Sequence, residues 1–191
     1  RAAAQSGHEI ADHMFEHRNP SEPDILEDHV RWSTEILRET SGQEIRGTNS
    51  HYPFHLLKKY GYTYMGGSNL ESVVPEYEYD AEGNAFVTMP HSFVLSDTYF
   101  FNFGYMGGKN AAQRFADPDH VYAVWLDAFQ YAYRTGGMFK LVLHDFEARS
   151  MRIAMLDRLI KEMQSMPGVW FASCGEMADY CLSSFPPEVV A

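Results

Sequence analysis

Apolar residues recur at helical spacing in several segments of the chain. Val121, Val124, Trp125, Ala128, Phe129 and Ala132 follow one another at i, i+3, i+4, i+7, i+8 and i+11, which predicts an amphipathic helix that Gly136 ends. Similar patterns predict a helix that follows the start signal at residues 20–24 and ends near Gly42, and helices from Phe54 to Tyr60, from Ile153 to Met163 and from Glu176 to Leu182. Short apolar runs between turn residues predict strands at 44–46, 62–65, 85–89, 138–143 and 169–172, with a long loop over 70–84.

Strands therefore alternate with helices along most of the chain. This order predicts an α/β fold with a parallel sheet, either an open sheet or a barrel, and the length fits a single domain over residues 1–191. Arg46, Asp97 and His144 fall at or just past the ends of predicted strands or loops. In parallel barrels that edge of the sheet carries the site.

Composition and charge exclude some functions. A net charge of -11 without a cluster of Lys and Arg makes nucleic acid an unfavourable partner. The sequence has no stretch of about 18 apolar residues, so we expect no membrane span. Cys174 and Cys181 lack a disulfide framework or a CxxC spacing, and free thiols suit a reducing cytoplasm, so we expect a cytoplasmic protein.

His13 and His17 are four residues apart near the beginning of the sequence. On a helical turn their imidazoles would lie on the same face and converge on one metal ion. The alternative is a solvated helix in which these histidines bind nothing. The pair His8-Glu9 suggests the HExxH motif of metalloproteases, but His13 follows one residue too late for that motif, which we therefore reject.

Three further polar residues are candidates for catalysis. His144 ends an apolar run and precedes Asp145, which would favour the protonated imidazole that a general acid needs, although a structural hydrogen-bonding role is the alternative. Arg46 precedes a Gly-containing loop and could hold a carboxylate through two hydrogen bonds, or be an ordinary surface cation. Asp97 lies in an aromatic stretch, where a carboxylate needs a partner or a cavity.

Taken in order, these segments resemble the polysaccharide deacetylase (NodB-homology) superfamily, particularly the branch with allantoinase-like and peptidoglycan-deacetylase-like proteins. Residues 7–17 resemble the motif whose two histidines bind a divalent metal, normally zinc, and residues 44–47 the motif whose arginine braces the catalytic aspartate. Residues 89–97 resemble the motif whose acid lines the groove, and 141–144 the motif whose histidine is the general acid. The resemblance implies a distorted (β/α) barrel, with His13 and His17 as metal ligands and His144, Asp97 and Arg46 as catalytic residues.

The sequence also departs from the family pattern. The first motif, an Asp pair that supplies the catalytic base and a third metal ligand, is absent, and we expect it upstream of Arg1, so that this chain lacks the N-terminal strands of the barrel. Met14, Thr48 and Asp145 stand where the family usually has Ser or Thr, Pro, and Pro. These replacements bear on substrate specificity more than on the metal.

Three functions follow from the resemblance. The first is a zinc-dependent hydrolase of non-peptide amide bonds that removes N-acetyl groups from an amino-sugar glycan. The second is an allantoinase-like hydrolase of a small cyclic amide or imide, which a closed pocket near Asp97 would favour over an open groove. The third is a non-catalytic binding or assembly module. Unpaired sheet edges lead us to expect a homo-oligomer.

Overall fold

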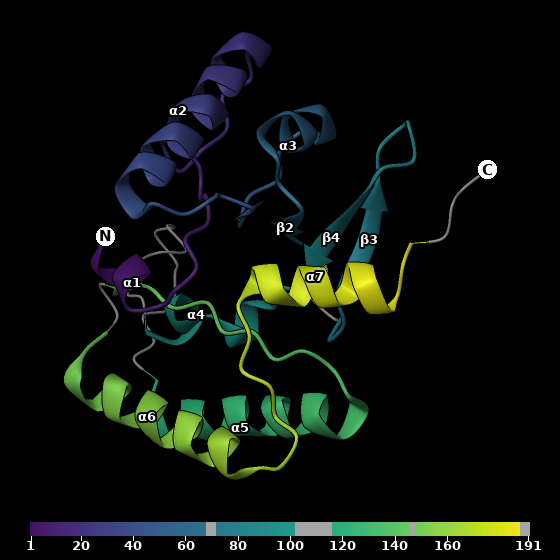
Figure 1. Ribbon diagram of the computed structural model, residues 1–191. Coiled ribbons are helices and arrows are strands. Elements are labelled where there is room, and N and C mark those ends of the chain that lie inside the picture. Colours follow the sequence, from purple (N-terminus) through teal and green to yellow (C-terminus); the bar gives the residue numbers. More distant parts are fainter. Residues whose placement is uncertain (68–71, 102–115, 146–147, 188–191) are drawn as a thin grey trace. The chain divides into compact units, whose positions relative to one another are not determined.

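The computed structural model describes residues 1–67, 72–101, 116–145 and 148–187 (Figure 1). The chain divides into two compact units, the first made of residues 1–67, 75–89 and 171–191, and the second of residues 68–74 and 90–170. Each unit is described by itself, and the single domain over 1–191 stays a prediction.

The first unit holds a sheet that four strands form among the described residues. They are β1 (Gly47–Thr48), β2 (Tyr64–Gly66), β3 (Glu76–Tyr79) and β4 (Ala85–Met89), in the order β1-β2-β4-β3. β1, β2 and β4 are parallel, and β3 pairs with β4 in the antiparallel sense. The predicted α/β class with a parallel sheet is confirmed. Asp12 extends the β1 edge through a single parallel bridge to Thr48.

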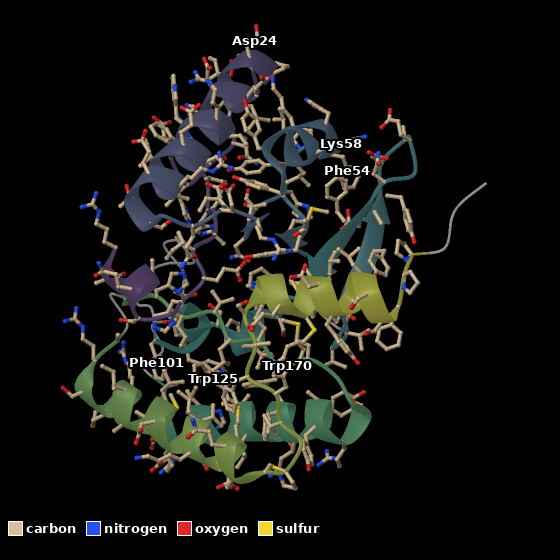
Figure 2. The ribbon with its side chains drawn as sticks, in the orientation of Figure 1. Asp24, Phe54, Lys58, Phe101, Trp125 and Trp170 are labelled. Carbon is tan, nitrogen blue, oxygen red and sulfur yellow. The ribbon has the colours of Figure 1, made fainter. Side chains whose placement is uncertain are left out.

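Four helices of the described residues belong to the first unit. They are α1 (Ala2–Gln5), α2 (Pro23–Ser41), α3 (Phe54–Tyr60) and α7 (Cys174–Ser184). Pro23 opens α2, and Gly42 ends it in the left-handed conformation with φ 75°, where a side chain would be strained. α2 packs against α3, and α7 packs across β2 and β4 (Figure 1). Phe54 of α3 stacks on Phe86 of β4 with 5.1 Å between ring centroids (Figure 2).

The second unit is built on two helices that lie side by side, α5 (Pro118–Thr135) and α6 (Ser150–Ser165) (Figure 1). It also contains the 3-10 helix η1 (Phe93–Leu95) and the short helix α4 (Asp97–Phe101). The Asp117 side chain caps α5 by accepting a hydrogen bond from the Asp119 amide. Phe101 and Trp125 lie in the core of this unit (Figure 2), and the Trp125 indole donates a hydrogen bond to the Val94 carbonyl at 2.9 Å.

Several predicted strands are wrong in position or in kind. The segment 44–46 is not a strand, and β1 begins just after it. β3 lies inside the predicted loop 70–84. Residues 70 and 71 of that loop lie outside the described part of the chain. Residues 138–143 form no strand, because the amides of Met138 and Val142 bond to two different segments, at Val73 and Leu95, instead of one continuous neighbour. Residues 169–172 form none either, and the Trp170 and Phe171 side chains are each 52% exposed where a core strand would bury them.

None of the helices in the described residues is long and apolar enough to cross a membrane.

Candidate functional site

His13 and His17 converge in the first unit, although no helix carries them. Their Nε2 atoms lie 3.1 Å apart, and the rings meet edge to face with centroids 4.8 Å apart. The predicted helical turn is wrong, because residues 13–18 have no helical hydrogen bonding. The pair is brought together instead by two left-handed residues, Met14 at φ 68° and His17 at φ 56°. Such conformations cost non-glycine residues about 1–3 kcal/mol each and persist only where the surroundings impose them.

The geometry of this pair fits the metal that the family resemblance implies. Two imidazole nitrogens that bind one zinc ion at about 2.0–2.1 Å in tetrahedral geometry lie about 3.3 Å apart. The 3.1 Å between the two Nε2 atoms is close to that value. Within the residues that the structure describes, no set of three or more His, Cys, Asp or Glu side chains is arranged to hold a metal. The described part of the chain therefore offers two ligands.

The segment leading into the histidines is fixed by hydrogen bonds to two other segments. The Ile10 amide donates to the Gln43 side chain at 3.0 Å, and Gln43 in turn donates to the His8 carbonyl at 2.9 Å. The Glu9 carboxylate accepts a hydrogen bond from the Gly175 amide in the first turn of α7 at 2.9 Å. Gly175 leaves room for this contact, since a Cβ there would lie 2.5 Å from Glu9 Oε1.

Asp12 anchors the same segment from inside the unit. Its side chain is 1% exposed, and its carboxylate accepts hydrogen bonds from the hydroxyls of Ser33, Tyr52 at 2.5 Å and Thr48 at 3.4 Å. Burial and the hydrogen bond to Asp12 both raise the pKa of Tyr52 well above its ordinary value, so that Tyr52 stays a donor. The carboxylate thus faces the interior, where hydroxyls satisfy it.

Arg46 is held by an acid from α7. Its guanidinium donates two hydrogen bonds to the Asp179 carboxylate, at 2.9 Å and 2.5 Å. This pairing lowers the pKa of Asp179 and raises that of Arg46. Arg46 therefore makes the bidentate contact with a carboxylate that its sequence context indicates. The sequence analysis did not identify Asp179 as the partner. A 133-residue separation hides such a pair from any local pattern.

Asp97 and His144 meet in the second unit. The Asp97 carboxylate accepts a hydrogen bond from the His144 amide at 2.6 Å, and its other oxygen lies 2.7 Å from Nδ1 of the same residue. Backbone hydrogen bonds from Asp97 to the Val142 carbonyl and from Val142 to the Leu95 carbonyl align the two segments. His144 is thus the partner that the buried Asp97 carboxylate requires.

The Asp97 contact defines which ring nitrogen of His144 can exchange a proton. A carboxylate only accepts hydrogen bonds, so Nδ1 carries the hydrogen that points at Asp97. Nε2 is then the nitrogen that takes up or releases a proton, in the manner of an imidazole oriented by an acid. The Asp97 side chain is 6% exposed and that of His144 is 26% exposed, so the pair opens to its surroundings on the histidine side.

An apolar cavity adjoins this pair. Its volume is about 50 Å³. The cavity is lined by Asp97 and His144 together with Phe101, Trp125, Leu143, Ala148, Arg152, Ile153, Met155 and Leu156. The Arg152 guanidinium lies 4.4 Å from the centre of the Phe101 ring. A space of this size holds a small group.

The structure thus brings together His13 with His17 and Asp97 with His144, each pair within its own unit, and joins Arg46 to Asp179. From the sequence, Asp12 and Glu16 are candidates to substitute for the missing third metal ligand, but the Asp12 carboxylate faces buried hydroxyl groups instead. Sequence reasoning missed Asp179, whose only signal is that it is an acid on a predicted helix.

The chain is similar in sequence to a protein of known activity. The chain is 23% identical to the peptidoglycan deacetylase of Helicobacter pylori over 214 residues, covering 95% of this chain and 72% of that protein. No family model matches the chain.

Solved structures share the fold. A polysaccharide deacetylase from Mycobacterium smegmatis matches 100% of this chain and 68% of its own, with a TM-score of 0.85 and 23% identity. Puue allantoinase matches 98% of this chain and 63% of its own, with a TM-score of 0.80 and 22% identity. A probable polysaccharide deacetylase from Pseudomonas aeruginosa PAO1 matches 98% of this chain and 64% of its own, with a TM-score of 0.79 and 23% identity. This chain therefore spans about two thirds of these solved chains.

Proposed function

From the likeness of this chain to the polysaccharide deacetylase superfamily in sequence and in its distorted-barrel fold, we propose that it is part of a metal-dependent hydrolase that removes N-acetyl groups from an amino-sugar glycan. The observation that carries the proposal is the 3.1 Å approach of the His13 and His17 Nε2 atoms, in the segment that resembles the metal-binding motif. Two strained residues maintain this approach, which a merely solvated histidine pair would not require.

The proposed metal is a divalent ion, zinc by family resemblance, held by His13 and His17. When bound, such an ion polarises the amide carbonyl and makes a water molecule acidic enough to attack near neutral pH. The general base is not assigned to a residue of this chain, because the sequence lacks the first motif.

His144 is the proposed general acid. Its Nε2 donates a proton to the amine as the carbon–nitrogen bond breaks, while Asp97 holds Nδ1 and balances the positive charge of the imidazolium. Proton transfer by a positioned side chain is worth about 10²–10⁴ in rate. Arg46 is assigned by family resemblance to brace the catalytic aspartate, and in the first unit its guanidinium binds the Asp179 carboxylate.

The apolar cavity is equally compatible with a second candidate, an allantoinase-like hydrolase of a small cyclic amide. A pocket of about 50 Å³ beside Asp97 and His144 suits a small group of a heterocycle as well as the methyl of an acetyl group. The two candidates differ in substrate size and not in the chemistry of the bond that breaks.

Metal analysis and two hydrolysis assays test the proposal. The chain is loaded with Zn²⁺, dialysed, and assayed for bound zinc, for acetate release from N-acetylglucosamine oligomers and for allantoin hydrolysis. Acetate release with bound zinc supports the deacetylase, and allantoin turnover alone supports the second candidate. Bound zinc without either turnover favours a binding or assembly module.

His13→Ala and His8→Ala form a matched pair of variants, because both remove an exposed imidazole from the same segment. We expect zinc to be lost from His13→Ala and retained by His8→Ala. Failure of the unaltered chain to bind zinc at saturation, or equal zinc in the two variants, would contradict the assignment.

A further inference from the structure

Asp12 stands immediately before the proposed metal ligand His13 and is tied to three other segments. Its amide donates a hydrogen bond to the Gly47 carbonyl at 2.9 Å, and its own carbonyl accepts one from the Asn49 amide at 2.9 Å. Its carboxylate reaches Ser33 on α2 and Tyr52 just before α3. Backbone and side chain together therefore fix the position and direction of the chain as it enters the histidine segment.

The partners of the Asp12 carboxylate come from three separate segments. In the described part of the chain they are the hydroxyl groups of Ser33, Thr48 and Tyr52. Removing a buried carboxylate that accepts several hydrogen bonds leaves its donors unsatisfied. The Asp12 side chain therefore ties the histidine segment to α2, to β1 and to the segment before α3.

The residues after Asp12 need such an anchor. Met14 and His17 both adopt left-handed backbone conformations, and the side chains of His13 and His17 are exposed. The two imidazoles lie 3.1 Å apart, and a fixed backbone at the base of the loop favours this approach over the many other conformations open to exposed side chains. Asp12 lies at that base, next to His13.

We propose that Asp12 is a positioning residue for the metal site, which acts through its buried hydroxyl contacts to hold His13 in reach of His17. This inference rests on the proposed function, since it assigns a role toward the same metal. Partners that orient ligands typically change metal affinity 10- to 100-fold when they are removed.

The test compares Asp12→Ala with Thr34→Val in the full chain. Thr34 lies on α2 beside Ser33 and bonds to Tyr62 at 2.8 Å without contacting Asp12, so its loss controls for a general drop in stability. We expect Asp12→Ala to bind Zn²⁺ about 10- to 100-fold more weakly in titrations against a chelating dye. Thr34→Val should bind Zn²⁺ as the unaltered chain does, and equal affinity in all three proteins would overturn the proposal.

A second readout needs no metal. In NMR spectra of the metal-free chain, we expect a nuclear Overhauser effect between the His13 and His17 rings, retained in Thr34→Val and lost in Asp12→Ala. Its retention in Asp12→Ala would refute the positioning role. Absence of zinc binding by the unaltered chain would instead contradict the proposed function, and the ring contact still decides the role of Asp12.

If Asp12→Ala fails to fold, Ser33→Ala and Tyr52→Phe replace it, because each removes one donor to the carboxylate and leaves Asp12 in place. We expect each of them to weaken the ring contact and zinc binding, and their combination to weaken both further. An unchanged ring contact in the combined variant would overturn the proposal.

Discussion

At the scale of single residues, the candidate site depends on how each carboxylate is satisfied. Asp97 is buried and accepts two hydrogen bonds from one residue, His144, whereas Asp179 is largely exposed and binds the Arg46 guanidinium. A buried acceptor that loses its donors costs far more than an exposed ion pair that water can replace. Replacing Asp97 by Asn should therefore lower the free energy of unfolding much more than replacing Asp179 by Asn.

Asp97→Asn is expected to lower the free energy of unfolding by about 1–3 kcal/mol. The amide keeps the shape of the side chain but has one acceptor oxygen, which the His144 amide N–H can use, and an NH2 group that would face Nδ1. The imidazole must then carry its hydrogen on Nε2, and the hydrogen bonds to the carboxylate charge are lost. Urea denaturation measures the change. Asp127→Asn, at an exposed position of α5, is the control and should stay within about 0.5 kcal/mol of the unaltered chain. Equal stability of the two variants would contradict the contacts of Asp97.

Asp179→Asn is expected to give a small, pH-dependent loss of stability. The hydrogen bond from Arg46 lowers the folded-state pKa of Asp179 below its ordinary 3.8. The contribution is therefore present above the unfolded-state pKa and disappears as pH falls through the folded-state pKa. The exposed position limits it to about 0.2–1 kcal/mol. Unfolding curves at pH 7 and near pH 3 check the trend, and Arg46→Gln should remove the same contribution in a double-mutant cycle.

The residue scale also shows what the sequence could predict about the site. The spacing of His13 and His17 correctly indicates that their imidazoles converge, but for the wrong reason, since left-handed backbone replaces the helical turn. The need of Asp97 for a partner follows from its aromatic neighbours, whereas the identity of that partner depends on contacts 47 residues away. Long-range pairs of this kind leave no local pattern in a sequence.

At the scale of elements, helices were more predictable than strands. Helices carry their own hydrogen bonds, so apolar spacing, Pro23 at the start of α2 and Gly42 at its end locate them from local sequence. A strand exists only where a neighbour pairs with it, which is why the apolar run 138–143 is not one. Conversely, β3, with alternating Glu and Tyr, becomes a strand through its pairing with β4.

The β1–β2 pair provides a prediction at this scale, because Gly47 lies under the ring of Tyr64. A Cβ at position 47 would come within 2.0 Å of the ring, and Tyr64 is only 4% exposed, so the ring has little room to move. Gly47→Ala is expected to destabilise the chain by about 1–3 kcal/mol in urea denaturation. In a Tyr64→Leu background the same substitution should cost less, since the smaller side chain relieves the overlap. An equal cost in both backgrounds would point to a cause other than the ring.

At the scale of the whole molecule, the fold is that of solved deacetylases and an allantoinase, and the predicted fold class is confirmed. The sheet in the described residues has β1 and β3 at its edges, and the expectation of a homo-oligomer from unpaired edges stays a prediction. At this scale the sequence correctly predicted the order of the segments. Each family motif is a local pattern that the sequence displays directly, whereas the fold depends on contacts between distant segments.

Metal binding links the local site to the stability of the whole chain. An ion that binds the folded state alone stabilises it by RT ln(1 + [L]/Kd), which is about 2.7 kcal/mol at a concentration of 100 Kd. Because His13 and His17 converge only in the folded chain, Zn²⁺ should raise the urea midpoint of the unaltered protein and of His8→Ala. His17→Ala leaves a single imidazole and should show little rise. The ratio of the midpoint shifts at several zinc concentrations then gives the Kd, which should agree with direct titration. A rise of equal size in His17→Ala would mean that zinc stabilises the chain elsewhere, and the histidine pair would lose its assignment as the metal site.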